Sequence, residues 1–236
     1  MKINFDEGYA FGLGVFETIA VEKEKPIFLE AHLKRLENSM NFLEISGRVL
    51  KEEVIDYLKE HPMDHGVLKI MVSPQNKIFS TRDNPYLKEH YERGFTLDYS
   101  KVLRNETSAL TFHKTMNYGD CILEKRHAAK IGLDEVLFLN TKGAITEGTT
   151  TNVFFIKKEQ IYTPKISSGL LPGIMRDYVY KTKKVIDTTI YPENVKDFEA
   201  CFLTNSLLGI MPVKQLGTHV FAKEYQIQPL PVTMFL

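Results

Sequence analysis

The sequence predicts an α+β protein built from two domains, and three observations lead to this prediction. Strand-like and helix-like apolar patterns alternate along the chain, short turns between the C-terminal strands favour antiparallel hairpins, and polar residues interrupt the periodicity at residues 101–109. The length of 236 residues fits one or two domains, since single cores rarely grow beyond about 250 residues. We therefore expect a small N-terminal domain over residues 1–103 and a larger C-terminal domain over residues 104–236.

The N-terminal part is expected to combine one sheet with two helices. Apolar runs within residues 12–30, separated by a charged turn, predict two strands joined by a hairpin. In the first strand, alternate residues share a face, with Phe16, Thr18 and Ala20 opposite Val15, Glu17 and Ile19. Helical spacing predicts a helix through Leu29, Leu33, Leu36, Met40 and Leu43. A second helix is expected over 49–60 and strands over 67–72 and 95–99, with a loop containing a helical portion over 73–93.

The C-terminal part is expected to contain more strands than helices. Helices are predicted over 118–131 and from Pro172, a favoured first-turn residue, to about residue 186. Strands are predicted over 135–140, 152–156 and 160–163, followed by the runs CFLT and PVKQL. The turn at residues 140–143 favours an antiparallel hairpin.

Composition and charge exclude several classes of protein. The 30 basic and 30 acidic side chains produce no large field that would attract nucleic acid or an anionic membrane. Cys121 and Cys201 have no paired spacing, so neither a disulfide framework nor a thiolate metal site is indicated. Charged residues interrupt the N-terminus, and no stretch approaches the roughly 20 apolar residues that span a bilayer. We expect a cytoplasmic protein that binds no metal, nucleic acid or membrane.

The sequence lacks the common hydrolase motifs. None of the seven histidines forms an HExxH run, and no GxSxG run occurs. Gly12 and Gly14 lack the third glycine of a dinucleotide loop, and we interpret them as a bend that lets backbone approach closely. The small-residue loop 167–173 leads into a predicted helix, whose free N–H groups would suit a phosphate. Taken alone, this loop is better explained as an ordinary helix start.

Two further segments change that interpretation. Residues 113–118 read HKTMNY, and residues 146–154 read TEGTTTNVF. These segments resemble the fold-type IV pyridoxal-phosphate enzymes, the class IV aminotransferase family, in which a K-x-x-N-Y run holds the Schiff-base lysine and a T-E-G-T-T-x-N run the pyridine-binding glutamate. The resemblance covers nearly the whole chain and includes GVFET at 14–18, AHLKRL at 31–36, GLLPGIMR at 169–176 and TNSLLGIMPV at 204–213. It implies a small α/β N-terminal domain and a larger C-terminal domain, whose mainly antiparallel sheet or barrel is flanked by helices.

The resemblance implies a role for each matching residue. Lys114 matches the lysine that carries pyridoxal 5'-phosphate and moves protons, and Glu147 matches the residue that pairs with the protonated pyridine nitrogen. Arg35 matches the phosphate-binding arginine, whose guanidinium fork suits a dianion, although a helix-surface ion pair is the alternative. The other implied cofactor contacts are Leu171 on the ring, and Ile174, Met175, Asn205 and Ser206 at the phosphate.

The substrate side of the family pattern is matched less completely. Phe16 and Thr18 occupy positions near the substrate, where Thr18 would form a hydrogen bond with it or relay a proton. Many members carry an arginine directly after the strand that here ends at residue 72. A serine and a proline follow here, which leaves Arg82 as the candidate for a substrate carboxylate. Members also usually begin with a further strand before the segment matching residues 6–8, and we expect its loss to weaken the small domain.

The reaction that the resemblance implies is a lyase reaction. GVFET, GIMR and TNSLLGIMPV resemble members that convert 4-amino-4-deoxychorismate to 4-aminobenzoate and pyruvate in folate biosynthesis. Two alternatives stay open: an aminotransferase of branched-chain or D-amino acids, and a noncatalytic or regulatory protein that has kept the cofactor scaffold. The R-x-H carboxylate trap of D-amino-acid aminotransferases is missing from residues 73–86, which disfavours that enzyme. The family also implies a small-molecule substrate and a homodimer.

Overall fold

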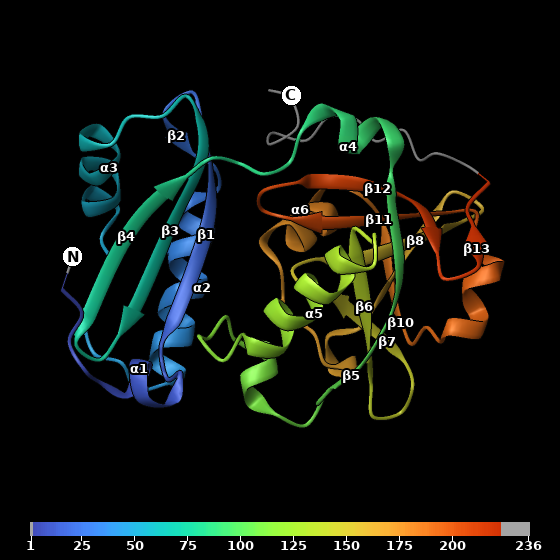
Figure 1. Ribbon diagram of the computed structural model, residues 1–236, viewed down its shortest axis with the longest axis horizontal. Helices are drawn as coiled ribbons and strands as arrows, with labels where there is room; N and C mark the ends of the chain where they lie inside the picture. Colours follow the sequence, from blue (N-terminus) through green and yellow to red (C-terminus); the bar gives the residue numbers. More distant parts are fainter. Residues whose placement is uncertain (1, 223–236) are drawn as a thin grey trace. The chain divides into compact units, whose positions relative to one another are not determined.

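The computed structural model describes residues 2–222, and contacts within it divide the chain into two compact units (Figure 1). Among the described residues, the first unit contains residues 2–85 together with His113–Tyr118, and the second contains Tyr86–Phe112 and residues 119–222. The chain does not divide at the predicted boundary, residue 103, because β5 (Phe95–Arg104) is hydrogen-bonded into the sheet of the second unit. Within residues 2–222, every helix is too short or too polar to span a membrane.

The first unit contains a four-stranded antiparallel sheet with the order β2-β1-β3-β4. Its elements in chain order are α1 (Glu7–Phe11), β1 (Val15–Glu22), β2 (Lys25–Pro26), α2 (Leu29–Phe42), α3 (Lys51–Glu60), β3 (His65–Ser73) and β4 (Asn76–Arg82). One face of this sheet packs against α2 and α3 through buried apolar residues that include Val15, Ile19, Leu68 and Ile70. The predicted alternation along β1 is therefore confirmed, and the opposite face carries Phe16 and Thr18.

Two predictions for this unit are wrong in ways that packing explains. The second strand of the N-terminal hairpin has only the two residues of β2, because the chain turns at Phe28, which has a φ of +54°, and begins α2. The stretch 73–93, which we expected to be a loop with a helical portion, contains the strand β4 before the short helix α4 (Lys88–Arg93). As an edge strand, β4 needs few apolar residues, so its sequence lacks the usual strand pattern.

The second unit is built on a 9-stranded mixed sheet with the order β10-β9-β8-β11-β12-β5-β6-β7 and with β13 beside β12. Its other elements are η1 (Ala109–Phe112), α5 (Gly119–Lys130), β6 (Glu135–Asn140), β7 (Ile145–Gly148), β8 (Asn152–Lys157), β9 (Gln160–Pro164), η2 (Ile166–Ser168), α6 (Ile174–Thr182), β10 (Val185–Thr188), η3 (Pro192–Asp197), β11 (Ala200–Asn205), β12 (Gly209–Leu216) and β13 (His219–Val220). The expected hairpins are confirmed, and only β10 with β9, β12 with β5 and β5 with β6 pair in parallel among the described strands.

The predicted helix over residues 172–186 is shorter than expected. It begins at Ile174, after the N-cap Gly173, and ends at Thr182. The residues that follow form β10, which pairs in parallel with β9. Two β-branched residues, Val185 and Ile186, favour a strand here once β9 offers an unpaired edge. The helix α6 packs on β11 (Figure 1).

Candidate active site

The segment His113–Tyr118 lies along the edge of β1, and this arrangement fixes the backbone of Lys114. Phe16 N donates a hydrogen bond to Lys114 O at 3.0 Å, and Met116 N donates one to Gly14 O at 2.7 Å. An isolated antiparallel β-bridge also joins the two segments. The predicted Schiff-base lysine is therefore held by the strand that carries the predicted substrate-side residues.

Gly12 and Gly14 make this close approach possible. Gly12 ends α1 with a φ of +70°, and Asn117 Nδ2 donates a hydrogen bond to its carbonyl at 3.0 Å. A Cβ atom on Gly14 would lie 2.6 Å from Met116 Sδ, closer than real Cβ contacts allow, and 3.0 Å from Val72 O, which is tighter than most such contacts. The interpretation of this glycine pair as a bend for close backbone approach is confirmed.

The amine of Lys114 lies beside two aromatic rings. Lys114 Nζ is 4.4 Å from the centroid of the Phe16 ring and 5.0 Å from that of Tyr118. These two rings meet edge to face with centroids 5.1 Å apart. Aromatic faces attract an ammonium group, so the two rings restrict where the lysine amine can lie.

On the helix side of β1, the predicted phosphate ligand Arg35 forms an ion pair with a buried carboxylate. Glu17 is fully buried and accepts hydrogen bonds from Arg35 Nε and Nη2, both at 2.7 Å. Burial is the largest single effect and would raise the pKa of Glu17, but the charges and hydrogen bonds of Arg35 and His32 together outweigh it and lower that pKa to about 2. Arg35 is therefore not a member of a helix-surface ion pair, since only 15% of its side chain is exposed.

His32, one turn before Arg35 in α2, contacts the same carboxylate. Its Nδ1 lies 2.6 Å from Glu17 Oε2, whereas its buried Nε2 has no hydrogen-bond partner within residues 2–222. Burial lowers the pKa of His32, so the ring is neutral at pH 7 and donates from Nδ1 to the carboxylate. The sequence analysis missed His32, although it lies within the AHLKRL run that contains Arg35.

In the second unit, Glu147 is held from two sides at the end of β7. Arg104 donates to its Oε1 from Nε at 3.0 Å and from Nη2 at 2.8 Å, and Leu171 N donates to its Oε2 at 3.0 Å. The carboxylate is almost completely buried. These contacts stabilise its ionised form and fix its orientation, and they bring together two residues that the sequence predicted at the cofactor ring, Glu147 and Leu171.

The loop before α6 is held to the sheet by Asn152. Asn152 Nδ2 donates a hydrogen bond to Leu171 O at 3.0 Å, and a Cβ atom on Gly173 would lie only 2.1 Å from Asn152 Oδ1. Gly173 is the N-cap of α6, so the amides of Ile174 and Met175 belong to the first turn, which has no intrahelical acceptors. This turn presents N–H groups and the positive end of a helix dipole, which suits a phosphate.

Asn205 and Ser206 form the second predicted phosphate-side loop. The Asn205 side chain stabilises this loop: its Oδ1 accepts from the amides of Leu207 and Leu208 at 2.8 Å each, and its Nδ2 donates to Thr150 O at 3.2 Å. Ser206 is half-buried beside it. The direct cofactor contacts of Asn205 and Ser206 stay predictions.

Thr204 of β11 adds a buried hydroxyl group next to Asn152 of β8. Thr204 lies opposite Asn152 in the antiparallel register of β11 and β8, so their side chains share a face of the sheet. Thr204 Oγ1 is buried and has no hydrogen-bond partner among the described residues. The sequence analysis did not assign Thr204, although it begins the TNSLLGIMPV run.

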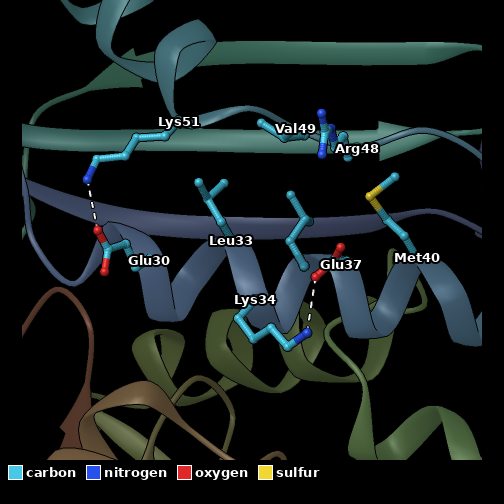
Figure 2. Close-up of a pocket in the computed structure, with 9 residues that line it drawn as sticks. Glu30, Leu33, Lys34, Glu37, Met40, Arg48, Val49 and Lys51 are labelled. Carbon is cyan, nitrogen blue, oxygen red and sulfur yellow. Dashed lines mark hydrogen bonds and ion pairs between the residues drawn. The ribbon is translucent and has the colours of Figure 1, made fainter.

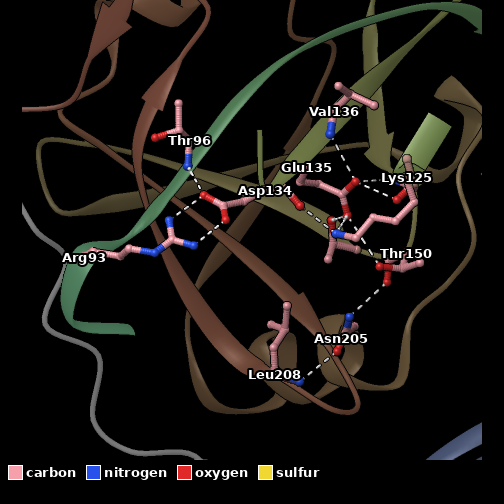
Figure 3. A network of polar contacts seen from close by, with 11 residues as sticks. Arg93, Thr96, Lys125, Asp134, Glu135, Val136, Thr150, Asn205 and Leu208 are labelled. Carbon is pink, nitrogen blue, oxygen red and sulfur yellow. Dashed lines mark hydrogen bonds and ion pairs between the residues drawn. The ribbon is translucent and has the colours of Figure 1, made fainter. Parts of the chain in front are cut away.

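A buried carboxylate that the sequence analysis missed organises the threonines after Glu147 (Figure 3). Glu135, at the start of β6, is fully buried. Its Oε1 accepts from Thr149 Oγ1 at 2.6 Å, and its Oε2 lies 3.4 Å from Thr150 Oγ1 and 3.5 Å from Lys125 Nζ. The TEGTTTN run therefore owes its shape to an acidic residue outside the run. The sequence feature that could have indicated a buried carboxylate is the position of Glu135, which begins the apolar run EVLFLN.

Arg82, the candidate for a substrate carboxylate, is the last residue of β4. Its side chain is exposed, and its Nη1 donates to Asp83 O at 3.0 Å. In the antiparallel register Arg82 lies opposite Val67, on the same sheet face as Phe16 and Thr18. Its role toward a substrate stays a prediction.

The groove shown in Figure 2 does not contain the predicted site. It has a volume of about 260 Å³ and lies along α2 and the chain that leads into α3. Its walls are made by Glu30, Leu33, Lys34, Leu36, Glu37, Met40, Arg48, Val49 and Lys51. None of these is a predicted cofactor or substrate residue.

The predicted residues thus form two groups, one in each compact unit. The first unit holds the substrate-side and lysine group, Phe16, Thr18, Arg35, Arg82 and Lys114. The second unit holds the ring and phosphate-loop group, Glu147, Leu171, Ile174, Met175, Asn205 and Ser206.

The chain is similar to known proteins over most of its length. The family model described as amino-transferase class IV matches residues 14–216. Aminodeoxychorismate lyase of Bacillus subtilis is 27% identical over 238 residues, which cover 90% of this chain and 80% of that protein. A Methanocaldococcus jannaschii protein described as a candidate branched-chain-amino-acid aminotransferase is 27% identical over 240 residues. These residues cover 92% of this chain and 83% of that protein. A Legionella pneumophila structure described as a candidate 4-amino-4-deoxychorismate lyase has 30% identity and a TM-score of 0.87, covering 94% of this chain and 89% of that chain.

Proposed function

Because the chain belongs to the class IV aminotransferase family, we propose that it is a pyridoxal-phosphate-dependent lyase that converts 4-amino-4-deoxychorismate to 4-aminobenzoate and pyruvate. The observation that carries the lyase assignment is the likeness to the Legionella structure, which extends over 94% of the chain. The runs GVFET, GIMR and TNSLLGIMPV support the same assignment.

The residues present fit pyridoxal 5'-phosphate. Arg35 and the first turn of α6 offer a guanidinium group and free amides for the phosphate, and Glu147 offers a carboxylate for the pyridine nitrogen. His32 Nε2 and Thr204 Oγ1 are buried polar atoms without partners among the described residues, which is unusual unless a ligand or water satisfies them. When bound, this cofactor supplies an electron sink for the carbon that bears the substrate amine.

Glu147 would keep that electron sink effective. Arg104 and the Leu171 amide donate to its carboxylate and fix its orientation, so that it would stabilise a positive charge on a ring nitrogen beside it. Burial of the carboxylate strengthens this interaction, since little water screens it. Leu171 would pack on the ring that Glu147 orients.

Lys114 and Thr18 would act on the substrate from the sheet face of the first unit. Lys114 Nζ, restricted by the Phe16 and Tyr118 rings, would remove the proton from the amine-bearing carbon. Thr18 would donate a hydrogen bond to the substrate or relay a proton to the departing enolpyruvyl group. Loss of that group leaves an aromatic ring, which makes the elimination favourable.

The test is incubation of the purified protein with 4-amino-4-deoxychorismate and no keto acid. We expect 4-aminobenzoate and pyruvate to appear in equal amounts, because the elimination regenerates the enzyme without a second substrate. The variant K114A supplies the background rate. A strict requirement for a keto acid, with an amino acid as the product, would contradict the lyase assignment.

One second candidate function has a specific observation in its favour. The Methanocaldococcus relative, described as a candidate aminotransferase, is as similar in sequence as the Bacillus lyase. An aminotransferase would leave the cofactor in its amine form after the first half-reaction and would need a keto acid to restore the aldehyde form. The absorption spectrum after one substrate addition, without a keto acid, separates the two functions.

Two expectations about the setting of the protein stay predictions. We expect a homodimer and a cytoplasmic location, as the family resemblance and the sequence imply. The mass of the purified protein in solution tests the first, and cell fractionation tests the second.

A further inference from the structure

The buried carboxylate of Glu135 contacts all three threonines of the TEGTTTN run that follow Glu147 (Figure 3). Its Oε1 accepts hydrogen bonds from Thr149 Oγ1 at 2.6 Å and from Thr149 N at 3.2 Å. Its Oε2 accepts from the hydroxyl groups of Thr150 and Thr151 at 3.4 Å each. A single side chain from β6 therefore holds the whole turn 149–151.

The glycine between Glu147 and this turn leaves no room for a side chain. A Cβ atom on Gly148 would lie 2.2 Å from Thr151 Oγ1 and 3.1 Å from Glu135 Cγ. Gly148 N also donates a hydrogen bond to Thr151 O at 2.7 Å, which closes the turn. The turn therefore packs directly against the Glu135 side chain, and a shift of that side chain would be transmitted to the chain beside Glu147.

The same turn also holds the second predicted phosphate-side loop. Thr150 O accepts a hydrogen bond from Asn205 Nδ2 at 3.2 Å, and Asn205 Oδ1 accepts from two amides of its own loop at 2.8 Å each. Thr150 thus contacts Glu135 through its hydroxyl group and Asn205 through its carbonyl group. A continuous series of hydrogen bonds joins Glu135 to the loop that contains Ser206.

Lys125 supplies a positive charge for this carboxylate. Its Nζ lies 3.5 Å from Glu135 Oε2 and donates a hydrogen bond to Asp134 O at 2.7 Å. The Glu135 side chain has no exposed surface, whereas 32% of the Lys125 side chain is exposed. Desolvation offsets much of the attraction in a pair of this kind, so it adds little to stability. A fully satisfied buried network instead fixes one arrangement of the groups that donate to it.

We propose that Glu135 is a positioning residue that couples the two ends of the cofactor site. Its carboxylate fixes the turn 149–151, which follows the predicted pyridine ligand Glu147 and holds the phosphate-side loop through Asn205. Displacement of this turn would loosen both ends of the site at once. This role rests on the cofactor assignment within the proposed function, and it holds for a lyase and for an aminotransferase alike.

The first experiment titrates the apo forms of wild type and E135Q with pyridoxal 5'-phosphate and with pyridoxal, followed by the absorbance of the bound cofactor. E135Q keeps the size of the side chain but removes its charge and one acceptor oxygen. We expect its affinity for pyridoxal 5'-phosphate to fall about tenfold or more, as for the loss of a hydrogen bond to a charged group. The affinity for pyridoxal, which has no phosphate, should fall by a smaller factor.

The matched control is D134N, at the residue directly before Glu135 in the chain. Asp134 forms an ion pair with Arg93 and accepts a hydrogen bond from Thr96 N at 2.9 Å. These partners belong to α4 and β5 and not to the turn 149–151. D134N should lower the free energy of unfolding without changing the affinity for either ligand. An equal loss of affinity in D134N and E135Q would overturn the proposal, because lower stability alone would then explain the effect.

A milder variant, T149V, serves if E135Q does not fold. Valine has the shape of threonine, so this change removes only the 2.6 Å hydrogen bond to Glu135 and the hydroxyl group that makes it. We expect T149V to weaken pyridoxal 5'-phosphate more than pyridoxal, by a smaller factor than E135Q does. Equal losses for the two ligands in T149V would overturn the connection to the phosphate side.

A double-mutant cycle with N205A tests the connection itself. If Glu135 acts on the phosphate-side loop through Asn205, the loss of pyridoxal 5'-phosphate affinity in E135Q/N205A should be smaller than the product of the two single losses. Losses that multiply exactly would show that the two residues act independently. That result would overturn the coupling of the two ends.

The failure of this role can be told apart from the failure of the proposed function. Unchanged cofactor affinity in both E135Q and T149V, with lower stability, would make Glu135 a structural residue and overturn its positioning role alone. Wild type that binds the cofactor but shows no lyase turnover overturns the lyase assignment, and the titrations still decide the role of Glu135. Wild type that binds no pyridoxal 5'-phosphate overturns the cofactor assignment and this role together.

Discussion

Arg35 donates two hydrogen bonds to the fully buried carboxylate of Glu17, from Nε and Nη2 at 2.7 Å each. The pair connects α2 to β1, whose other face carries Phe16 beside Lys114. The strand β1 therefore helps to hold both the predicted phosphate ligand, through Glu17, and the predicted Schiff-base lysine, through its backbone.

Replacing Glu17 by Gln should destabilise the protein and weaken its hold on the cofactor. The amide cannot accept from both Arg35 nitrogens, so a cation with only 15% of its side chain exposed is left without its counter-charge. Breaking a buried pair in this way costs on the order of 3 kcal/mol. Urea unfolding measures the loss, and dialysis followed by absorbance measures cofactor retention. The exposed pair partner Glu37 supplies the control, since E37Q should change neither quantity.

Stability should fall at acidic pH in a way that depends on Glu17. The folded-state pKa of about 2 lies below the ordinary value of 4.5, so the unfolded chain binds the proton first as the pH falls. The contribution of Glu17 is therefore fully present above about pH 4.5 and is lost between there and about pH 2. Unfolding free energies at a series of pH values should fall more steeply for wild type than for E17Q. Parallel curves would mean that Glu17 is not held in its ionised form.

The variant E147Q should retain the cofactor but turn over slowly. A neutral amide cannot stabilise a protonated ring nitrogen, and we expect a loss of kcat of about a hundredfold. Cofactor absorbance after dialysis and steady-state kinetics separate binding from turnover. The exposed Glu193 in the same unit provides the control E193Q, for which full activity is expected. Normal kcat in E147Q would remove Glu147 from the site.

Adding one methyl group at Gly173 should disturb the phosphate loop. A Cβ atom there would lie 2.1 Å from Asn152 Oδ1, and Asn152 is the residue that holds Leu171 O. We expect G173A to lose cofactor on dialysis much faster than wild type. The control G119A adds the same methyl group where no atom lies within 4 Å, at the start of α5, and should retain cofactor normally.

Borohydride reduction should attach the cofactor to a single peptide that contains Lys114. Mass spectrometry of the digested protein identifies the modified residue. Because Lys69 lies at the same Phe16 ring, it is the lysine most able to compete. Label on Lys69 in place of Lys114 would contradict the role predicted for Lys114. The variant K114A should carry no label and show no turnover.

Much of the candidate site could be predicted because its chemical groups lie in short ordered runs. HKTMNY and TEGTTTN identify the lysine and the glutamate, and the alternation along β1 places Phe16 and Thr18 on one face. The helix α2 also follows from its apolar spacing. These features depend on residues that are neighbours in sequence, so local periodicity is sufficient to find them.

The partners of those groups could not be predicted in the same way. Glu17 meets Arg35, Glu135 meets the threonines after Glu147, and Lys69 meets the Phe16 ring through contacts between separate elements. The strand β4 was missed because an edge strand can be polar. A sequence pattern states which face of an element is apolar, but strand register and helix packing decide which side chains meet across elements.

The sequence by itself therefore determined the family, the reactive groups and the alternation along β1. Only the tertiary structure decided which buried charges hold those groups in place, because that depends on contacts between residues far apart in the chain.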